Sequence, residues 1–236
     1  MNGKKEPVSS EKKELPNSDE LIYDLEVKLR AKVFQHIIIS LVQNNRTFTP
    51  DFIKQIKLLY QKAEESQQEI MQWIPESEIH RSEIHCKKGC SYCCGLTVHV
   101  AIPELYIIFE HLLKTRSADC LKKLIKNLKS YVREMDKCQS VTEKLRIKCT
   151  FLENGICSIY ECRPFSCRAW NSMNLQSCID YLTNQDVEIP SSTYYYTPFN
   201  TYRQGITRGL SVMGFEDITE ELNSGVLRLL EGEFGK

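Results

Sequence analysis

Apolar residues recur at close to helical spacing near the start of the chain. The series comprises Leu21, Leu25, Leu29, Val33, Ile37 and Leu41. It predicts one long amphipathic helix, because side chains three to four positions apart share a helix face. Asn17 followed by Glu20 is a helix-start signal of the capping-box kind, and Asn44 is expected to end this helix.

A second helix is predicted directly after the first. Thr49 followed by Pro50 indicates its start, since a capping hydroxyl and a first-turn proline both favour helix N-termini, and Pro75 is expected to close it. Residues 17–75 are therefore predicted to form an N-terminal helical hairpin. The polar residues 1–16 show no periodicity and are expected to form a flexible tail.

The rest of the chain also shows mainly helical periodicity. Four further helices are expected to start at Pro103, at Ser117, at Thr197-Pro198 (ending at Gly214) and at residue 219 (ending at 231). Residues 96–100 are expected to be briefly extended, and Asn154-Gly155 predicts a tight turn between two short segments. The predicted fold is mainly α, with cysteine-bearing loops in a domain over residues 76–236 held together by a metal centre.

Charge and hydropathy exclude several partners. Lys and Arg together number 31, as do Asp and Glu, so the formal net charge is zero and a chain-wide basic surface for nucleic acid is absent. The longest apolar run, residues 37–42, is far shorter than the roughly 20 residues that span a bilayer. The first residues lack the apolar stretch of a secretory signal. We therefore expect a cytoplasmic protein with reduced thiols and no membrane partner.

Eight of the eleven cysteines fall into two groups, and their spacing is the strongest chemical signal in the sequence. The first group reads Cys86-Lys-Lys-Gly-Cys90-Ser-Tyr-Cys93-Cys94, and the second comprises Cys149, Cys157, Cys167 and Cys178. Core cysteines have no reason to occur four times in nine residues beside lysines. In a reducing compartment, thiolates at these intervals indicate ligation of Zn²⁺ or of an iron–sulfur cluster.

The number of centres stays open at this stage. Neighbouring residues such as Cys93 and Cys94 usually project in different directions, so both seldom serve one metal with ideal angles. Eight thiolates allow two four-thiolate centres, or one centre with spare thiols. The three remaining cysteines are predicted to be ordinary packed residues: Cys120, Cys138 and Cys162.

Basic residues flank the cysteines throughout. They are Arg81, Lys87, Lys88, Lys144, Arg146, Lys148, Arg163 and Arg168. Cations near thiols lower the thiol pKa and offset the negative charge of a Cys₄ centre. Arg168, adjacent to Cys167, is the strongest candidate to support the ligands. His85, as a replacement ligand, and His99, as a general base, are weaker candidates, since exposed or structural histidines are more common.

The combined motif resembles a known family. Cys-x3-Cys-x2-Cys-Cys, followed by Cys-x-Phe-Leu-x-x-Gly-x-Cys-Ser-Ile-Tyr-Glu-x-Arg-Pro-x-x-Cys-Arg, is similar to the YkgJ-type cysteine cluster family, also described as the CxxCxxCC zinc- or iron-chelating domain. The resemblance covers residues 82–230 and leaves the hairpin outside. It implies that the eight grouped cysteines are the ligands and that Glu161, Arg163 and Arg168 support them. Thr150 departs from the usual proline, which affects the turn more than the ligation.

Three functions follow as hypotheses. The first is a cytoplasmic iron–sulfur or zinc protein with a redox or group-transfer role, either an iron–sulfur oxidoreductase or a protein-modifying transferase. Flagellin lysine methylases resemble the family in carrying a similar cluster, which by analogy suggests a protein substrate. The second is a zinc-stapled module that binds a protein partner without catalysis, and the third is a metal-delivery or storage protein. The Cys93-Cys94 pair favours the first, because structural zinc rarely needs more thiolates than its coordination number.

Overall fold

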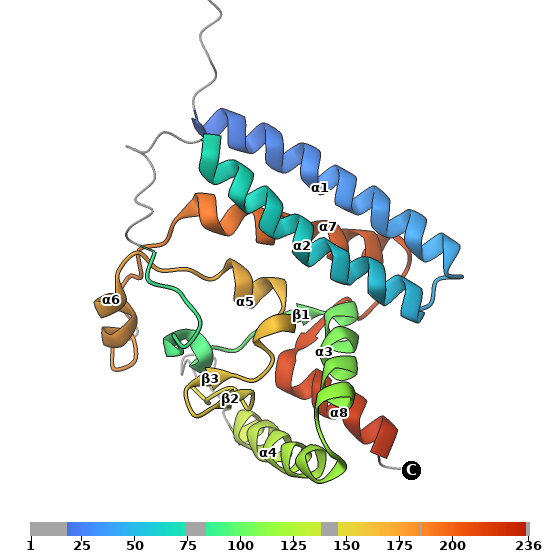
Figure 1. Cartoon of the computed structure of the whole chain (residues 1–236), viewed down its shortest axis with the longest axis vertical. Helices are drawn as coiled ribbons and strands as arrows, with labels where there is room; N and C mark the ends of the chain where they lie inside the picture. The colour runs from blue at the N-terminus through green and yellow to red at the C-terminus, as the bar shows by residue number, and fades with distance from the viewer. Residues whose placement is uncertain (1–17, 74–83, 138–145, 185, 235–236) are drawn as a thin grey trace, which may run out of the picture.

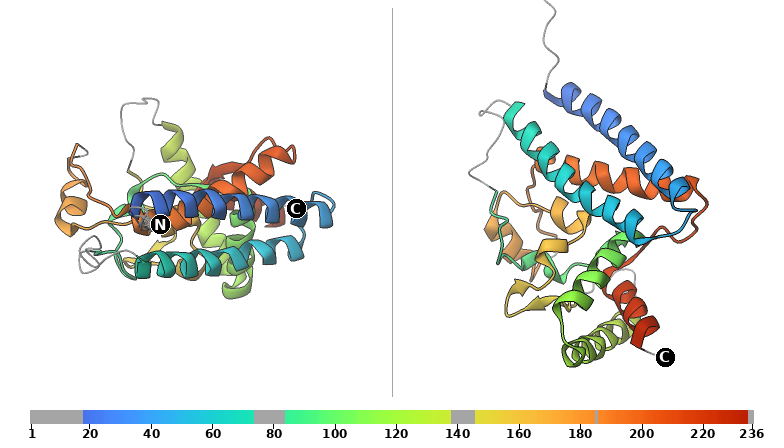
Figure 2. Two further views of the ribbon diagram at one scale, coloured as in Figure 1. Left: turned by 90° about the horizontal axis from the view of Figure 1, so that it is seen from above. Right: turned by 45° about the vertical axis from the view of Figure 1, so that its right-hand side comes forward.

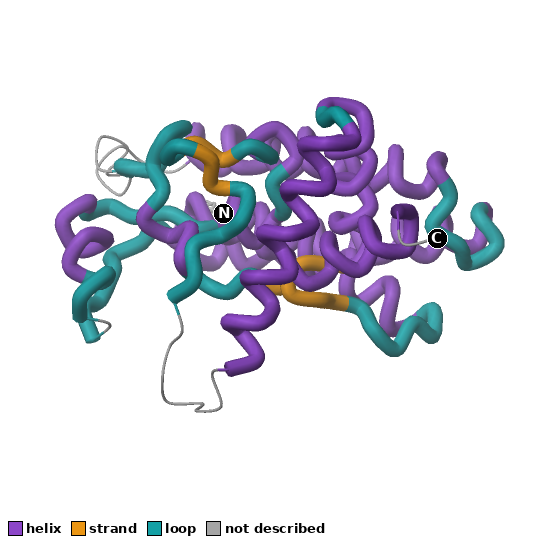
Figure 3. The backbone as a smooth tube through the Cα atoms, turned by 90° about the horizontal axis from the view of Figure 1, so that it is seen from below, coloured by secondary structure: helices purple, strands orange, loops and turns teal. Residues whose placement is uncertain are grey.

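A computed structural model describes residues 18–73, 84–137, 146–184 and 186–234. The predicted mainly helical fold is confirmed, with eight α-helices in these ranges (Figure 3). The helices are α1 (Ser18–Gln43), α2 (Pro50–Trp73), α3 (Ile102–Thr115), α4 (Ala118–Lys137), α5 (Phe165–Ala169), α6 (Leu175–Asp180), α7 (Thr193–Val212) and α8 (Leu222–Phe234). Short 3₁₀-helices and strands lie between them: η2 (Tyr92–Gly95), η3 (Tyr160–Cys162), β1 (His99–Ala101), β2 (Leu152–Glu153), β3 (Ile156–Cys157) and β4 (Thr219–Glu221).

The two N-terminal helices pack together with a helix from near the other end of the chain. α1 and α2 lie side by side, and α7 packs against both (Figure 1 and Figure 2). One apolar core runs through these three helices and continues into α3, α4, α5 and α8. The predicted boundary at residues 75–76, the tail over residues 1–16 and the Asn17 cap all lie outside the described residues and stay predictions.

Two glycines of α7 allow the close approach of α1. A Cβ atom at Gly205 would lie 2.7 Å from the side chain of Val33, and one at Gly209 would lie 2.5 Å from Cγ2 of Ile37. Protein interiors are too closely packed for such distances. A side chain at either glycine would therefore push the two helices apart or force neighbouring side chains out of their preferred rotamers.

Alanine at Gly209 is expected to lower the free energy of unfolding by about 1–2 kcal/mol. Overpacking costs about 1–3 kcal/mol, and the better helix propensity of alanine returns up to about 1 kcal/mol. The matched control is Gly232→Ala in α8, where no atom lies within 4 Å of the added Cβ. It should leave stability unchanged or raise it slightly. Chemical denaturation compares the two, and equal responses would contradict the tight α1–α7 contact.

The predicted start and turn signals are largely confirmed. At the start of α2, the Oγ1 atom of Thr49 accepts a hydrogen bond from the backbone N–H of Phe52 at 3.2 Å. α3 and α4 begin within one residue of their predicted starts. Between β2 and β3, Asn154 and Gly155 have φ values of 51° and 79°, which is the left-handed conformation that the Asn-Gly turn predicts.

The helix start predicted at Thr197, which corresponds to α7, is wrong by several residues. α7 begins at Thr193 rather than Thr197, and Ser192 caps it through a hydrogen bond from the N–H of Tyr195 to its Oγ at 3.4 Å. Pro198 lies inside α7. A proline this close to a helix start removes one backbone hydrogen bond, and the serine cap upstream supplies a stronger start signal.

The start of the last helix also differs from the prediction. α8 begins at Leu222, and residues 219–221 form β4 instead, antiparallel to β1 with His99 opposite Glu221. The N–H of Leu222 donates to the carbonyl oxygen of Val98 at 2.9 Å. The partner strand lies far away in the sequence, so no local pattern could reveal this pairing.

Glu104 is a buried carboxylate that joins three helices beneath the cysteine loops. Its side chain is fully buried at the start of α3. The hydroxyl of Tyr60 in α2 donates to its Oε1 atom at 3.0 Å, and the backbone N–H of Phe165 in α5 donates to the same oxygen at 2.8 Å. The N–H of Ala101 donates to Oε2 at 2.9 Å. These bonds fix α2, α3 and α5 relative to one another.

Candidate metal centre

The two predicted cysteine groups meet in the folded chain. η2 carries Cys93 and Cys94, and the backbone N–H of Cys149 donates to the carbonyl oxygen of Cys94 at 2.8 Å. Cys157 ends β3, while α6, which carries Cys178, packs against η2. Segments that are distant in sequence therefore bring their thiols to one region.

A cavity of about 330 Å³ lies between these segments. Six of the eight predicted ligands line it: Cys90, Cys93, Cys94, Cys149, Cys157 and Cys167. Cys86 and Cys178 are not part of this lining. The cavity therefore receives thiols from both sequence groups, which is the arrangement that the spacing alone could not establish.

Cys94 is electrostatically linked to three thiols of the second group. Burial raises the pKa of Cys149 to about 12, and it also raises the pKa values of Cys157 and Cys167. Charge on Cys94 raises all three pKa values further. Mutual repulsion of this kind indicates thiols that lie near one another and would share the benefit of a bound cation.

The remaining thiols form a second set. Burial raises the pKa of Cys86, and charge on Cys90 and Cys178 raises it further. Cys93 lies between the two sets, and its hydrogen bond with Cys94, followed by burial, raises its pKa. The same hydrogen bond lowers the pKa of Cys94 to about 7. The adjacent pair therefore joins the two sets of thiols.

Backbone N–H groups face three of the sulfur atoms, and the amide of Ser172 lowers the pKa of Cys86. The amide of Phe151 lowers the pKa of Cys149, and the amide of Ile159 lowers the pKa of Cys157, although burial outweighs both. For Cys149 and Cys157 the donor lies two residues after the cysteine. A hydrogen bond from an amide to sulfur favours the thiolate, which is the form that binds metal.

Arg163 is the cation that acts on the thiols. Its guanidinium lowers the pKa of four of them: Cys86, Cys94, Cys157 and Cys167. It stacks on the ring of Tyr160 at 4.2 Å, and its Nε atom is buried without a hydrogen-bond partner among the described residues. Its place beside the thiols suits the supporting role that the resemblance implies.

Arg146 contributes a second buried guanidinium. It lies beside Gly95 of η2 and stacks on the ring of Tyr181 at 4.3 Å, just after α6. All three of its guanidinium nitrogens are buried, with no hydrogen-bond partner in the part of the chain that the structure describes. An unpaired buried cation is costly unless negative charge lies nearby. Ionised thiolates on η2 and α6 would supply that charge.

Arg168 and Glu161 make contacts away from the thiols. Arg168 forms an ion pair with Glu64 of α2 and lies 4.8 Å from the ring centre of Tyr60. Glu161 is exposed and pairs with Lys88 at 3.4 Å, which joins the loops of the two cysteine groups. Both residues thus connect segments around the cysteines, and their support of a bound metal stays a prediction.

The other sequence candidates lie apart from the thiols or at the edge of their cavity. His85 is exposed, and His99 is exposed where it lines the cavity. The prediction that Cys120 is a packed residue is wrong, because it is exposed on α4. The prediction for Cys162 is confirmed: it is buried in the core, and burial raises its pKa to about 12. Cys138 lies outside the described residues.

Thr150 has contacts that a proline could not make. Its backbone N–H donates to the Oδ1 atom of Asn223 in α8 at 3.2 Å, and the thiol of Cys149 lies 3.8 Å from the same oxygen. Proline has no backbone N–H. Thr150 therefore anchors the cysteine loop to α8.

The sequence analysis did not identify the residues other than cysteine that line the cavity. Tyr196, Asn200 and Arg203 of α7 line the cavity, together with Trp170 after α5. The spacing of the first three places them on one helix face, which is a signal that the sequence contained. Without a known fold, nothing indicated that this face would meet the cysteines.

In this structure the sulfur atoms are not arranged around a common metal position. Within the described residues, no group of three or more His, Cys, Asp or Glu side chains is arranged to hold a metal ion. The thiol–thiol hydrogen bond between Cys93 and Cys94 belongs to a protonated arrangement. The donor chemistry and the unpaired guanidinium groups fit a thiolate-bound metal, and binding would require the thiols to turn toward it.

Comparisons with protein-family models, curated proteins and solved structures find no match to this chain. The resemblance to the YkgJ-type family therefore stays a prediction that depends on the motif residues. No helix within the described ranges has an apolar stretch long enough to cross a membrane. The fold and the site define a mainly α-helical protein in which many cysteines surround a cavity.

Proposed function

We propose that this chain is a cytoplasmic metal-binding protein of the YkgJ type, in which the eight grouped cysteines hold an iron–sulfur cluster or Zn²⁺. The observation that carries the proposal is the cavity lined by six of them, with Arg163 in its wall and the unpaired guanidinium of Arg146 beside Gly95 of η2. A four-thiolate centre is anionic and would supply the charge that these cations lack.

Two centres fit the electrostatic grouping better than one. One would use Cys94, Cys149, Cys157 and Cys167, whose charges act on one another. The other would use Cys86 with Cys90 and Cys178, whose charges act on it, and Cys93 as a fourth ligand. Charge on Cys94 and Cys167 also acts on Cys93, so Cys93 lies near the first set as well. Each set supplies the four thiolates that Zn²⁺ or an iron–sulfur cluster takes.

A redox or group-transfer role is the favoured activity. The cavity has walls beyond the cysteines, with the aromatic rings of Trp170 and Tyr196 and the polar groups of Asn200 and Arg203. Arg203 donates to Oδ1 of Asn200 at 2.8 Å and forms no ion pair among the described residues. A purely structural site needs no such walls, whereas a substrate held beside the thiols would use them.

A zinc-stapled module that binds a protein partner is the second candidate. η2 and α6 contain no buried residue, although they carry three of the predicted ligands. Apolar packing therefore holds these segments weakly, and a metal would supply the missing stability. This role requires no catalysis.

Metal analysis of protein purified without oxygen tests both functions. An iron–sulfur cluster would give a brown protein with absorbance near roughly 400 nm from thiolate-to-iron charge transfer. A colourless protein with stoichiometric zinc would contradict the iron assignment and favour the stapled module. Metal-free protein under reducing, anaerobic conditions would contradict both.

A further inference from the structure

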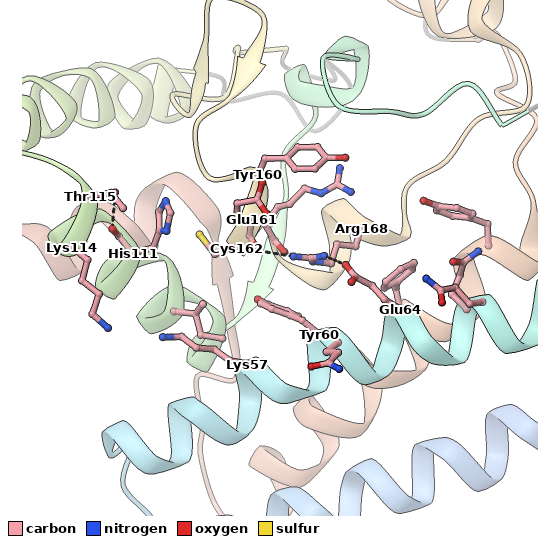
Figure 4. A pocket seen from close by; sticks show the side chains of 17 residues that line it. Lys57, Tyr60, Glu64, His111, Lys114, Thr115, Tyr160, Glu161, Cys162 and Arg168 are labelled. Carbon is pink, nitrogen blue, oxygen red and sulfur yellow. Dashed lines mark hydrogen bonds and ion pairs between the residues drawn. The ribbon is translucent and has the colours of Figure 1, made fainter.

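A second, larger cavity lies apart from the cysteine cavity. It has a volume of about 750 Å³ and runs between α2, α3 and η3 (Figure 4). None of the eight predicted ligand cysteines lines it; the residue with sulfur in its wall is the buried Cys162. Tyr160 and Arg163 belong to both cavities and form the wall between them.

This second cavity is an elongated groove. Its floor is one face of α2, where the lining positions repeat at intervals of three and four: Lys57, Tyr60, Gln61, Glu64, Gln67 and Gln68. Eleven steps along a helix correspond to about 16 Å at 1.5 Å per residue. An extended chain advances about 3.3 Å per residue, so the groove matches about five residues of extended peptide.

One end of the groove is basic. Lys57 from α2 and Lys114 from α3 reach this end together with His111 (Figure 4). Both ammonium groups share one carboxylate, that of Glu110, at 2.6 Å for Lys57 and 3.6 Å for Lys114. Two positive charges therefore face one negative charge at this end of the groove. A carboxylate from a bound molecule would neutralise the remaining positive charge.

The middle of the groove offers a further cation. Arg163 lines the groove there, with its guanidinium stacked on the ring of Tyr160 at 4.2 Å. The neighbouring Arg168 is already paired with Glu64 and with two backbone carbonyl oxygens. At the far end, Gln67 and Gln68 place amide groups that can bind a peptide backbone.

We propose that this groove binds an extended, acidic peptide segment of a partner protein. One carboxylate of the peptide lies at Lys57 and Lys114, another lies toward Arg163, and the glutamine side chains of α2 bind its backbone. The length of the groove and its separate cationic points fit a chain better than a small anion, which would occupy one point only. Arg163 borders both cavities, so at this point the peptide would share a cation with the thiolates of the proposed function.

An array of immobilised acetylated hexapeptides of varied sequence tests the proposal. The whole chain, as purified, should bind preferentially to peptides that carry two or more acidic residues. The double variant Lys57→Glu, Lys114→Glu should weaken this binding at least about tenfold, because complementary charge becomes repulsion. The variant Gln68→Trp, which fills the groove without a change of charge, should weaken it as well.

The matched control reverses the charge of two exposed lysines of α4 that do not line the groove, through Lys123→Glu and Lys126→Glu. This control variant should bind the peptides as tightly as the unaltered chain. Circular dichroism and metal content of every sample separate loss of binding from loss of fold or metal. Equal binding of acidic and basic peptides, or unchanged binding by the groove variants, would overturn the proposal. So would free glutamate that competes as well as the peptides, since that would indicate a small-anion site.

Discussion

Serine in place of Cys94 is expected to release part of the bound metal and to lower the thermal midpoint. In the proposed pair of centres Cys94 is a ligand together with three thiols on whose pKa values its charge acts: Cys149, Cys157 and Cys167. Metal-binding free energy is folding free energy, with apparent values of about 10–16 kcal/mol for structural zinc. The loss of one ligand is therefore among the largest effects that a single substitution can have here.

The companion variant Cys86→Ser is expected to release a different part of the metal, and the double variant should release all of it. Cys120→Ser is the matched control, since this cysteine is exposed on α4, and it should keep all metal with at most about 0.5 kcal/mol of change. Plasma mass spectrometry gives the metal per chain. Complete loss in either single variant would indicate one shared centre, and full retention in Cys94→Ser would make Cys94 a spare thiol.

Alanine at Glu104 is expected to lower the free energy of unfolding by about 3–5 kcal/mol. The fully buried carboxylate accepts hydrogen bonds from Tyr60, Phe165 and Ala101, and its removal leaves three buried donors unpaired. Each unpaired donor costs about 1–3 kcal/mol, and the effects are not fully additive. Chemical denaturation measures the loss.

Two further variants of acidic residues make this test specific. Glu104→Gln keeps one acceptor oxygen and should cost less than alanine. Glu134→Gln, on the exposed face of α4, should change stability by less than about 0.5 kcal/mol. If Glu104→Gln lowered the free energy of unfolding no more than Glu134→Gln, the hydrogen bonds of the buried carboxylate would not stabilise the packing of α2, α3 and α5.

The same carboxylate predicts a pH dependence with a defined sign. Burial raises the pKa of Glu104, and the hydrogen bonds from its three partners only partly oppose this. A folded-state pKa above the unfolded value of about 4.3 means that ionisation destabilises the fold. The stability advantage over Glu104→Gln should therefore be largest below that value and fall as pH rises through the folded pKa. A difference that grows with pH would show that the donors outweigh burial.

Local patterns determined much of the fold. The apolar period of one helical turn gave α1, α2, α3 and α4 with nearly correct bounds, and Asn154-Gly155 placed the turn between β2 and β3. These features depend on residues within a few positions of one another, which is why sequence alone reveals them. The start of α7 was missed because the Ser192 cap lies upstream of the predicted one. The start of α8 was missed because residues 219–221 pair with a strand that is distant in the sequence.

The sequence by itself determined which residues are the candidates for metal ligation, since the spacing of eight cysteines sets them apart from core residues. Only the tertiary structure brought cysteines of both groups to one cavity, with Arg163 in its wall, whereas Arg168 pairs with Glu64. The groove along α2 likewise exists only where α3 and η3 close over it. Charge interactions and cavity walls depend on distance in space, and packing of remote segments sets that distance.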